Sequence, residues 1–252
     1  MDRSINKALK RDSLNRSAKG SEMLETLGRR IVSGEYAVGE TLPIEAELIE
    51  EFSVSRTTLR EAIKTLTALG LLEVRPRHGT RVRPQREWTL LNRDVLRWMQ
   101  PVNGFNVELS TAIDEAREVF EPAACALAAV RADRKEITRI RLAYEAMEQA
   151  AAEDDVPAAI QADKEFHLSI LAATGNPILE AFDTAIDAVL GQLFRAAIEV
   201  HMESFRKNLV NHLRVLEAIE QGKPEEARQA MLDMISLTRR HLKNYKIIQP
   251  NS

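Results

Sequence analysis

The chain contains little that would suit an exported, membrane-spanning or single-strand-binding protein. It has one cysteine, Cys125, among 252 residues, so no intrachain disulfide can form and a reducing compartment is expected. Aromatic residues make up only 5%, too few for the stacking platforms that bind single-stranded nucleic acid. The N-terminus is polar and charged, unlike a signal peptide, and no apolar run approaches the ~20 residues of a membrane helix. These absences favour the cytoplasm.

Charge is distributed unevenly along the chain. The net charge is −3, but residues 1–84 carry 15 Lys and Arg against 12 Asp and Glu, a local charge of +3. The remaining residues carry −6. With 44% hydrophobic residues, the chain is long enough for two ordinary domains. The opposite charges indicate one module for an anionic partner and a second module with a different task.

The first module is predicted to consist of short helices followed by two strands. Residues 1–20 are basic, lack apolar periodicity and are predicted to be a disordered arm. Helices with apolar residues at helical spacing are expected near residues 21–32, 45–52 and 55–69. Ser55 is a good N-cap for the last of them, and Gly70 is a good C-terminal stop. The runs "LLEV" and "TRVRP", joined by "RPRHG", predict a β-hairpin.

This order of elements is that of a winged helix-turn-helix, predicted here over residues 21–84. If the apolar residues of the last helix point inward, its outer face carries Arg56, Thr57, Arg60 and Lys64. Arginine pairs with guanine through two hydrogen bonds, and threonine contacts phosphate or the thymine methyl group. The basic hairpin would contact phosphates or the minor groove. Alone, the helix fits an ordinary solvated helix equally well, but the combination favours double-stranded DNA.

The segment "LPIEAELIEEFSVSRTTLREAIKTLTALGLLEVRPRHGTRV", Leu42–Val82, resembles the N-terminal head of the GntR superfamily of bacterial transcription regulators. The match is long and has no gap. It implies DNA contacts from the second helix of the motif and from the wing tip, by Ser55, Arg56, Thr57, Thr58, Arg60, His78 and Gly79. Many relatives have an arginine where this chain has Ala46. One expected DNA contact is therefore missing, and the operator preference of relatives does not transfer.

A linker and an all-helical module are predicted after the wing. Residues 85–106 contain two tryptophans and several aliphatic residues, too many for a free tether, so a short packed helix is expected. Within residues 107–246, helices are expected at 107–131, 134–152, 156–173, 177–201, 204–221 and 223–246. The predicted fold class is mainly α, with a winged helix-turn-helix, a small β wing and an all-α helical bundle.

Three residues of the helical module form a candidate metal site. Asp163 and His167 are four residues apart and share one helix face, and His212 begins a later helical segment. One carboxylate and two imidazoles suit zinc, nickel, manganese or iron. Taken alone, the Asp163–His167 spacing is more often a surface pair, because such polar pairs are ordinary on exposed helices.

Three segments of this module resemble successive parts of the all-helical FadR-type ligand-binding domain, the FCD domain. They are "IDEAREVFEPAACALAA", "DKEFHLSILAATGNP" and "NHLRVLEAIEQGKPEEARQAML". The resemblance implies a divalent metal, zinc first, on Asp163, His167 and His212. A fourth histidine is usual where this chain has Met234. The site would have three protein ligands, or be completed by effector and water.

Four residues are candidates for effector binding: Arg117, Asn176, Arg195 and Met234. Arg117 matches a family arginine that points into the cavity and suits a carboxylate, although an ion pair on its own helix explains it equally well. Asn176 matches a family residue near the pocket, and helix capping is its alternative. Arg195 faces either the cavity or solvent. Cys125 is most simply a buried small residue.

The sequence predicts a homodimeric, ligand-responsive transcription regulator, a repressor of a catabolic operon, and not an enzyme. The expected partners are double-stranded operator DNA and a small carboxylate effector. The linker run "REWTLLNRDVLRW" and the methionine at the fourth ligand position resemble regulators of sugar-acid catabolism, of the galactonate type. Two alternatives stay open: a fatty-acyl-responsive regulator of the same superfamily, and a metalloenzyme with iron held by two histidines and one carboxylate.

Overall fold

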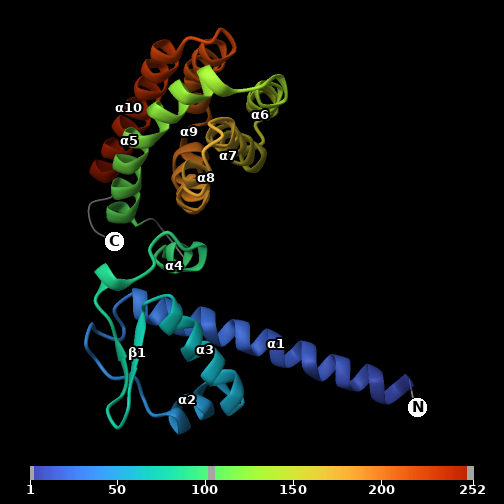
Figure 1. The fold of residues 1–252 in the computed structure, drawn as a ribbon, viewed down its shortest axis with the longest axis vertical. Helices are drawn as coiled ribbons and strands as arrows, with labels where there is room; N and C mark the ends of the chain where they lie inside the picture. Colours follow the sequence, from blue (N-terminus) through green and yellow to red (C-terminus); the bar gives the residue numbers. More distant parts are fainter. Residues whose placement is uncertain (1–2, 102–105, 249–252) are drawn as a thin grey trace. The chain divides into compact units, whose positions relative to one another are not determined.

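The computed structural model describes the backbone of residues 3–101 and 106–248. Side chains are described for residues 18–101, 106–184, 202–203 and 205–237. The chain divides into two compact units, Met1–Gln100 and Pro101–Ser252. Both are mainly helical, and the first also holds a two-stranded antiparallel sheet (Figure 1). The predicted fold class is confirmed.

The first unit is a small helical head with a β-hairpin. Its elements are α1 (Arg3–Val32), α2 (Glu45–Phe52), α3 (Arg56–Ala68), β1 (Leu72–Arg75) and β2 (Gly79–Val82). The hairpin pairs Leu72 with Val82 and Arg75 with Gly79. Leucines from α1, α2, α3 and β1 fill one apolar core, together with Met23, Ile31 and Val82. Helical spacing of these apolar residues is what folds the helices onto one another.

Helix α1 starts earlier than the sequence predicts. Residues 3–20, expected as a disordered arm, are helical in the structure. The segment contains no proline, and its first glycine is Gly20. Its lysines, arginines, leucines and alanines are good helix formers, so a helix that is anchored by buried Met23 and Leu27 can extend toward the N-terminus.

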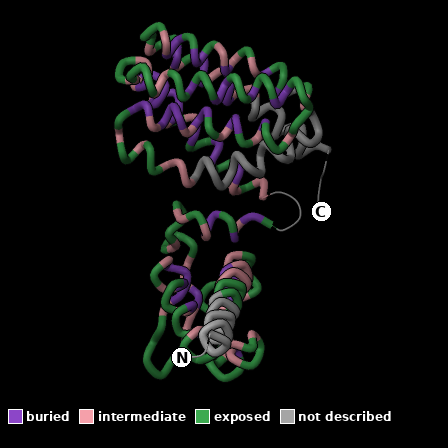
Figure 2. The backbone as a smooth tube through the Cα atoms, turned by 90° about the vertical axis from the view of Figure 1, so that its right-hand side faces the viewer, coloured by how far each residue is buried: buried purple, intermediate pink, exposed green. Residues whose placement is uncertain are grey.

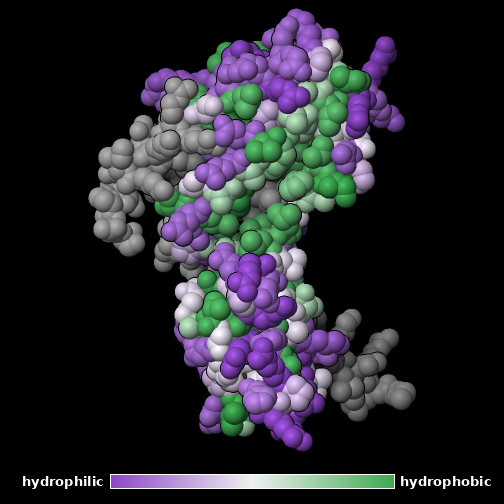
Figure 3. Space-filling view, turned by 60° about the vertical axis from the view of Figure 1, so that its left-hand side comes forward, coloured by the Kyte–Doolittle hydropathy of each residue, from purple (hydrophilic) through white to green (hydrophobic). Residues whose placement is uncertain are grey.

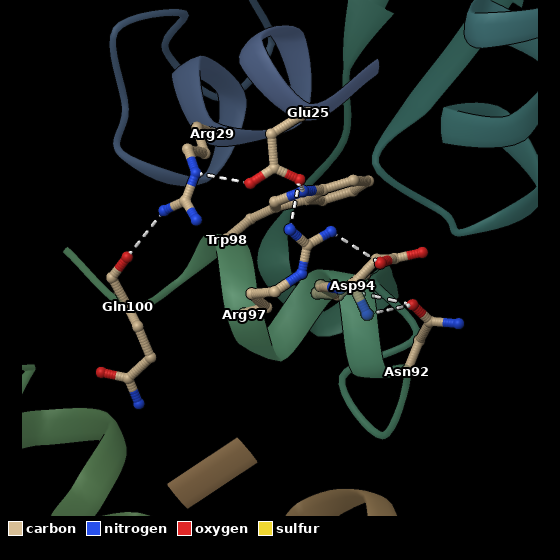
Figure 4. Close-up of polar contacts among 8 residues, drawn as sticks. Glu25, Arg29, Asn92, Asp94, Arg97, Trp98 and Gln100 are labelled. Atoms are coloured by element: carbon tan, nitrogen blue, oxygen red, sulfur yellow. Dashed lines mark hydrogen bonds and ion pairs between the residues drawn. The ribbon is translucent and has the colours of Figure 1, made fainter. Parts of the chain in front are cut away.

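The linker after the wing packs onto the head. It contains a 3-10 turn (Gln85–Glu87) and the helix α4 (Arg93–Trp98), which Asn92 caps by accepting the Asp94 and Val95 N–H groups. Trp98 is buried, and its Nε1 donates to Glu25 on α1 at 2.7 Å (Figure 4). A short packed helix was expected here, and α4 confirms it. Residues 102–105 of the predicted linker lie outside the described residues.

The second unit is a bundle of long helices. They are α5 (Val107–Arg131), α6 (Arg134–Ala152), α7 (Val156–Ala173), α8 (Pro177–Glu180), α9 (Asp183–Glu220) and α10 (Pro224–Ile248). Side-chain caps begin four of them: Asn106 for α5, Asp133 for α6, Asp155 for α7 and Asn176 for α8. Buried residues follow the inward sides of these helices (Figure 2). One core of small, aliphatic and aromatic residues joins them.

One break in this unit is misplaced by the sequence analysis. Helices were expected at 177–201 and 204–221, but the structure has a short α8 and then one continuous α9. Between Gly191 and Gln221 the chain has no proline or glycine, so nothing interrupts the helix. Among the described residues, no helix is both long and apolar enough to cross a membrane.

Candidate nucleic-acid interface and metal centre

Helix α3 presents the side chains that the sequence placed on its outer face. Its N-cap Ser55 accepts the Thr58 N–H at 3.1 Å, which fixes where the helix starts. Arg56, Thr57, Arg60 and Lys64 are exposed, whereas Leu59 and Leu66 are buried. Thr58 is half-buried, and its hydroxyl lies 2.8 Å from the Ser55 hydroxyl. Thr58 therefore supports the N-cap, and Arg56, Thr57, Arg60 and Lys64 lie on the outer surface of α3.

The hairpin tip carries the predicted wing residues. Arg77 and His78 are exposed between the two strands, and Gly79 is exposed at the start of β2. Gly79 has φ +81°, and a Cβ at this position would lie 2.8 Å from the Thr41 methyl group. Glycine is therefore required both by the turn and by the close approach. Hydrophilic residues cover much of the first unit on the face shown in Figure 3.

The three predicted metal ligands meet inside the second unit. Asp163 and His167 come from α7 and His212 from α9, and one ligand atom of each lies within 4.8 Å of the others. All three are buried, with at most 2% of the residue exposed. His212 Nε2 lies 3.0 Å from Asp163 Oδ1, and His167 Nε2 lies 3.7 Å from Asp163 Oδ2. The surface-pair alternative for Asp163 and His167 is thereby excluded.

The hydrogen-bond contacts of the His167 and His212 rings determine which ring nitrogen presents a lone pair to Asp163. His212 Nδ1 lies 3.0 Å from the carbonyl oxygen of Asn208, which can only accept, so Nδ1 carries the proton of a neutral ring. His167 Nδ1 lies 2.7 Å from a Glu121 oxygen, and its Nε2 lies 3.5 Å from Arg117 Nη2, which can only donate. Both neutral rings therefore turn an unprotonated Nε2 toward Asp163.

A cation at its centre would satisfy this arrangement. In neutral rings, two lone pairs face the Asp163 carboxylate, and its oxygens accept no hydrogen bond from a described residue. A buried carboxylate without a donor is costly. One ligand atom of each of the three residues lies within 4.8 Å of the others, and imidazole with carboxylate is a ligand set that zinc accepts. The three residues fit a divalent metal ion.

Arg117 and Glu121 form a buried ion pair beside these ligands. Arg117 Nε donates to Glu121 Oε1 at 2.5 Å, and its Nη1 lies 4.0 Å from Asp114 Oδ1. Burial alone would lower the pKa of Arg117, but the charges of Glu121 and Asp114 outweigh it and raise that pKa. Burial alone would raise the pKa of Glu121, but Arg117 and His167 lower it to about 2. Both groups are charged at neutral pH.

Carboxylates outnumber guanidinium groups among the described contacts of this cluster. Arg117 supplies the guanidinium, and Asp114, Glu121 and Asp163 supply the carboxylates. A divalent ion would offset this excess, and buried charges are tolerated when they are paired. The excess of carboxylates and the facing lone pairs both favour a metal at this place.

The other effector candidates have different environments. Asn176 caps α8 by accepting the Ile178 N–H at 3.0 Å. This is the helix-capping role that the sequence analysis gave as the alternative to a place near the pocket. Met234 is buried in the core of the bundle. Arg195 falls in α9, but its side chain lies outside the described residues. Cys125 is fully buried and burial raises its pKa, as expected of a packing residue. The roles of Asn176, Arg195 and Met234 toward an effector stay predictions.

Sequence reasoning missed two partners of the histidines. Glu121 lies four residues after Arg117, a spacing that indicates their ion pair. The fold also brings Glu121 to His167, which this spacing does not indicate. The Asn208 contact uses a backbone carbonyl, which carries no sequence signal. Such outer partners orient ligating histidines and raise their basicity.

Comparisons with known proteins identify the families of the two units. Residues 20–82 match the family "Bacterial regulatory proteins, gntR family", and residues 112–237 match the FCD domain. The galactonate operon transcriptional repressor of Escherichia coli is 34% identical over 89% of this chain and 97% of its own. The transcriptional repressor NanR of Enterobacter is 29% identical over 93% of this chain and 90% of its own.

Solved structures share the fold. The Streptococcus agalactiae GntR structure covers 88% of this chain and 99% of its own, at 26% identity and a TM-score of 0.50. A Listeria monocytogenes regulator, Lar, covers 89% and 96% at 23% identity, with a TM-score of 0.59. The chain belongs to the GntR family of bacterial regulatory proteins, with an FCD domain, and it is a ligand-responsive DNA-binding transcription regulator, not an enzyme.

Proposed function

We propose that this protein is a homodimeric repressor of a catabolic operon, which a small sugar acid releases from its operator. Two relatives support the sign of regulation, since both are called repressors. One of them is named for a galactonate operon, which makes galactonate the first effector to test. A bacterial regulator of this kind acts in the cytoplasm, where the chromosome lies.

A divalent metal on Asp163, His167 and His212 is the core of the proposed effector site. The observation that carries it is the 3.0 Å approach of His212 Nε2 to the Asp163 carboxylate with no proton between them in the neutral ring. Zinc suits this ligand set best, and nickel, manganese and iron also bind imidazole and carboxylate. When bound, the ion would act as a Lewis acid that attracts a carboxylate or hydroxyl oxygen.

Arg117 is proposed to receive the effector carboxylate. Its Nε and Nη2 already serve Glu121, but Nη1 is buried and makes no hydrogen bond with a described residue. A buried guanidinium nitrogen without an acceptor is costly, and a carboxylate would satisfy it through a charge-assisted bond. Asn176, Arg195 and Met234 are proposed as further members of this pocket.

The dimer is proposed from the outer face of α5. Val119 and Val130 are 78% and 71% exposed and lie on the same side of the helix. A stripe of apolar residues runs along that side: Ala112, Ala116, Val119, Ala123, Leu127 and Val130. Contiguous exposed apolar surface marks interaction sites, and a second copy of the chain would cover it. Two heads on half-sites about one helical turn apart would then read a palindromic operator.

A thermal-shift screen tests the effector proposal. Full-length protein is heated with galactonate and other sugar acids, with added zinc or with a chelator. We expect a sugar acid to raise the melting temperature only when metal is present. An equal shift in chelator would show that metal has no part in effector binding. A shift with acyl thioesters but not with sugar acids would instead support the fatty-acyl alternative.

A further inference from the structure

An acidic side chain lies among the arginines of the DNA-reading surface. Glu45, the first residue of α2, places Oε1 3.3 Å from Arg60 Nε and Oε2 3.8 Å from Arg56 Nε. All three side chains are at least 48% exposed, so they meet on the surface of the head. One carboxylate of α2 therefore contacts both arginines near the start of α3.

Glu45 also lines a groove with cationic walls. The groove has a volume of about 840 Å³ and runs between α2, α3 and the wing. Its walls carry four cations, Arg60, Lys64, Arg75 and Arg77, and Glu45 is its one acid among the described residues. An acid in a groove that meets phosphates weakens binding to every DNA sequence. Such an acid can nevertheless increase the discrimination between one DNA sequence and another.

The geometry of the Arg60 contact suits such a role. Glu45 approaches Arg60 at Nε, the inner edge of the guanidinium, which leaves the two terminal amino groups for a base. A guanine is read by two parallel hydrogen bonds, so the plane of the guanidinium must be held. Exposed ion pairs contribute little to folding, so the pair is not explained by stability. A helix-start acid favours the helix dipole, but Glu47 already binds the Ile44 N–H at that end.

We propose that Glu45 is a specificity-determining residue of the head, which positions Arg60 to read one guanine and weakens binding to DNA that lacks it. Glu45 acts through Arg60 and does not touch the base itself. The proposal rests on the DNA-binding function and on α3 as the recognition helix, and it is independent of metal and effector.

Selection from a random duplex pool tests the proposal. The full-length protein, Arg60→Ala, Glu45→Ala and Glu45→Gln each select sites, and the base preference at every position is compared. Arg60→Ala should reduce the preference for one guanine by about 5- to 150-fold, the range of a bidentate arginine–guanine pair. Glu45→Ala should reduce the preference at that same position by about 5-fold or more, while affinity for random duplex stays equal or rises. Glu45→Gln should retain much of the preference, because its amide oxygen still accepts from Arg60 Nε.

Glu50→Ala is the matched control. Glu50 is an exposed acid of the same helix, and it forms no ion pair with a described residue. Its loss changes the net charge equally but should leave the preference at every position unchanged.

The outcomes separate the assignments. If the wild-type protein selects no motif, sequence-specific DNA binding is refuted. If Arg60→Ala changes no position, Arg60 reads no base and the positioning role falls with it. If Arg60→Ala changes a position and Glu45→Ala leaves it intact, or alters a different one, Glu45 does not position Arg60. Equal tightening on all sequences would reduce Glu45 to a repulsive charge and overturn the proposal.

Discussion

At the scale of single residues, substitution of one histidine in each unit tests the two proposed sites separately. His78 is exposed at the wing tip, whereas His167 is buried beside Asp163 and Glu121. His167→Ala removes one of three proposed ligands, so metal affinity should fall by more than the roughly 10- to 100-fold that loss of an outer partner costs. Effector response should disappear, and operator binding should remain. Mass spectrometry measures the metal content of the variant. Fluorescence anisotropy with selected DNA duplexes measures its operator binding.

The matched control for this prediction is His78→Ala. It should keep metal and weaken DNA binding by about 1 kcal/mol, as expected for one lost wing contact. Wild-type metal affinity in the His167 variant would remove this residue from the site.

Arg117 allows a second prediction at this scale. Alanine here would leave buried Glu121 without its guanidinium partner, at a cost of about 3–5 kcal/mol, so loss of effector binding would be confounded by unfolding. Lysine keeps the charge but loses the planar fork. Arg117→Lys should retain folding and metal and weaken effector binding by about 1.5–3 kcal/mol, the value of one charged hydrogen bond. Calorimetry with the sugar acid found in the screen measures it, and an unchanged affinity would assign Arg117 a purely structural role.

Residue identity indicated the three candidate ligands but not their surroundings. The spacing of Asp163 and His167 required a shared helix face, but only the fold shows that this face is buried and meets His212. The alternatives for Arg117 could not be separated in the sequence, because Glu121 and Asp114 lie one turn away on either side. The structure shows both contacts and still leaves Nη1 without a hydrogen bond to a described residue.

At the scale of elements, α4 is held on α1 by an unusually close contact. A Cβ at Gly28 would lie 2.6 Å from the Trp98 ring. Glycine to alanine in a helix interior ordinarily stabilises by about 0.5–1 kcal/mol. Gly28→Ala should instead destabilise the head, by about 1–3 kcal/mol, since the ring must move. Gly20→Ala, on the same helix, meets only a Thr58 methyl group at 3.1 Å and should cost less.

Denaturant unfolding followed by tryptophan fluorescence measures this prediction. Both tryptophans, Trp88 and Trp98, belong to the first unit, so the signal reports the head alone. A Gly28 variant as stable as the Gly20 variant would show that the Trp98 contact is loose.

Glu25 joins the same two helices and predicts a pH dependence. Burial raises its pKa, but hydrogen bonds from Trp98 and Arg29 and the charge of Arg97 outweigh burial and lower the pKa below the ordinary 4.5 (Figure 4). A lowered pKa stabilises the head fully above pH 4.5, and this stabilisation is lost as pH falls through the lower folded value. Glu25→Gln should therefore cost about 1 kcal/mol at pH 7. The difference from wild type should shrink below pH 4.5, and a constant difference would contradict this.

The elements themselves were largely predictable. Apolar spacing, together with the Ser55 cap and the Gly70 stop of α3, gave α2, α3, the hairpin and α5 to α7 nearly as they are. The start of α1 was missed because polar residues without an apolar face gave no signal, although nothing in them prevents a helix. Docking of α4 depends on Gly28 leaving room for Trp98, residues 70 positions apart, and no local pattern records that pairing.

At the scale of the whole molecule, metal and effector should bind reciprocally. If the effector carboxylate is held by both Arg117 and the ion, each ligand must tighten the other by the same factor. We expect a coupling of about 5- to 150-fold, the usual range. Calorimetric titration of effector with and without zinc, and of zinc with and without effector, gives two factors that must agree. Independent affinities would place the effector away from Asp163, His167 and His212.

The most direct test of the account is a zinc titration of metal-stripped, full-length protein by calorimetry. We predict that the wild-type chain binds one ion per protomer, and that the double variant His167→Ala, His212→Ala binds none at that site while retaining its selected operator. The basis is the buried Asp163 carboxylate, which accepts no hydrogen bond from a described residue and faces two imidazole nitrogens. Failure of the wild-type chain to bind a divalent ion, or full binding by the double variant, would contradict the account.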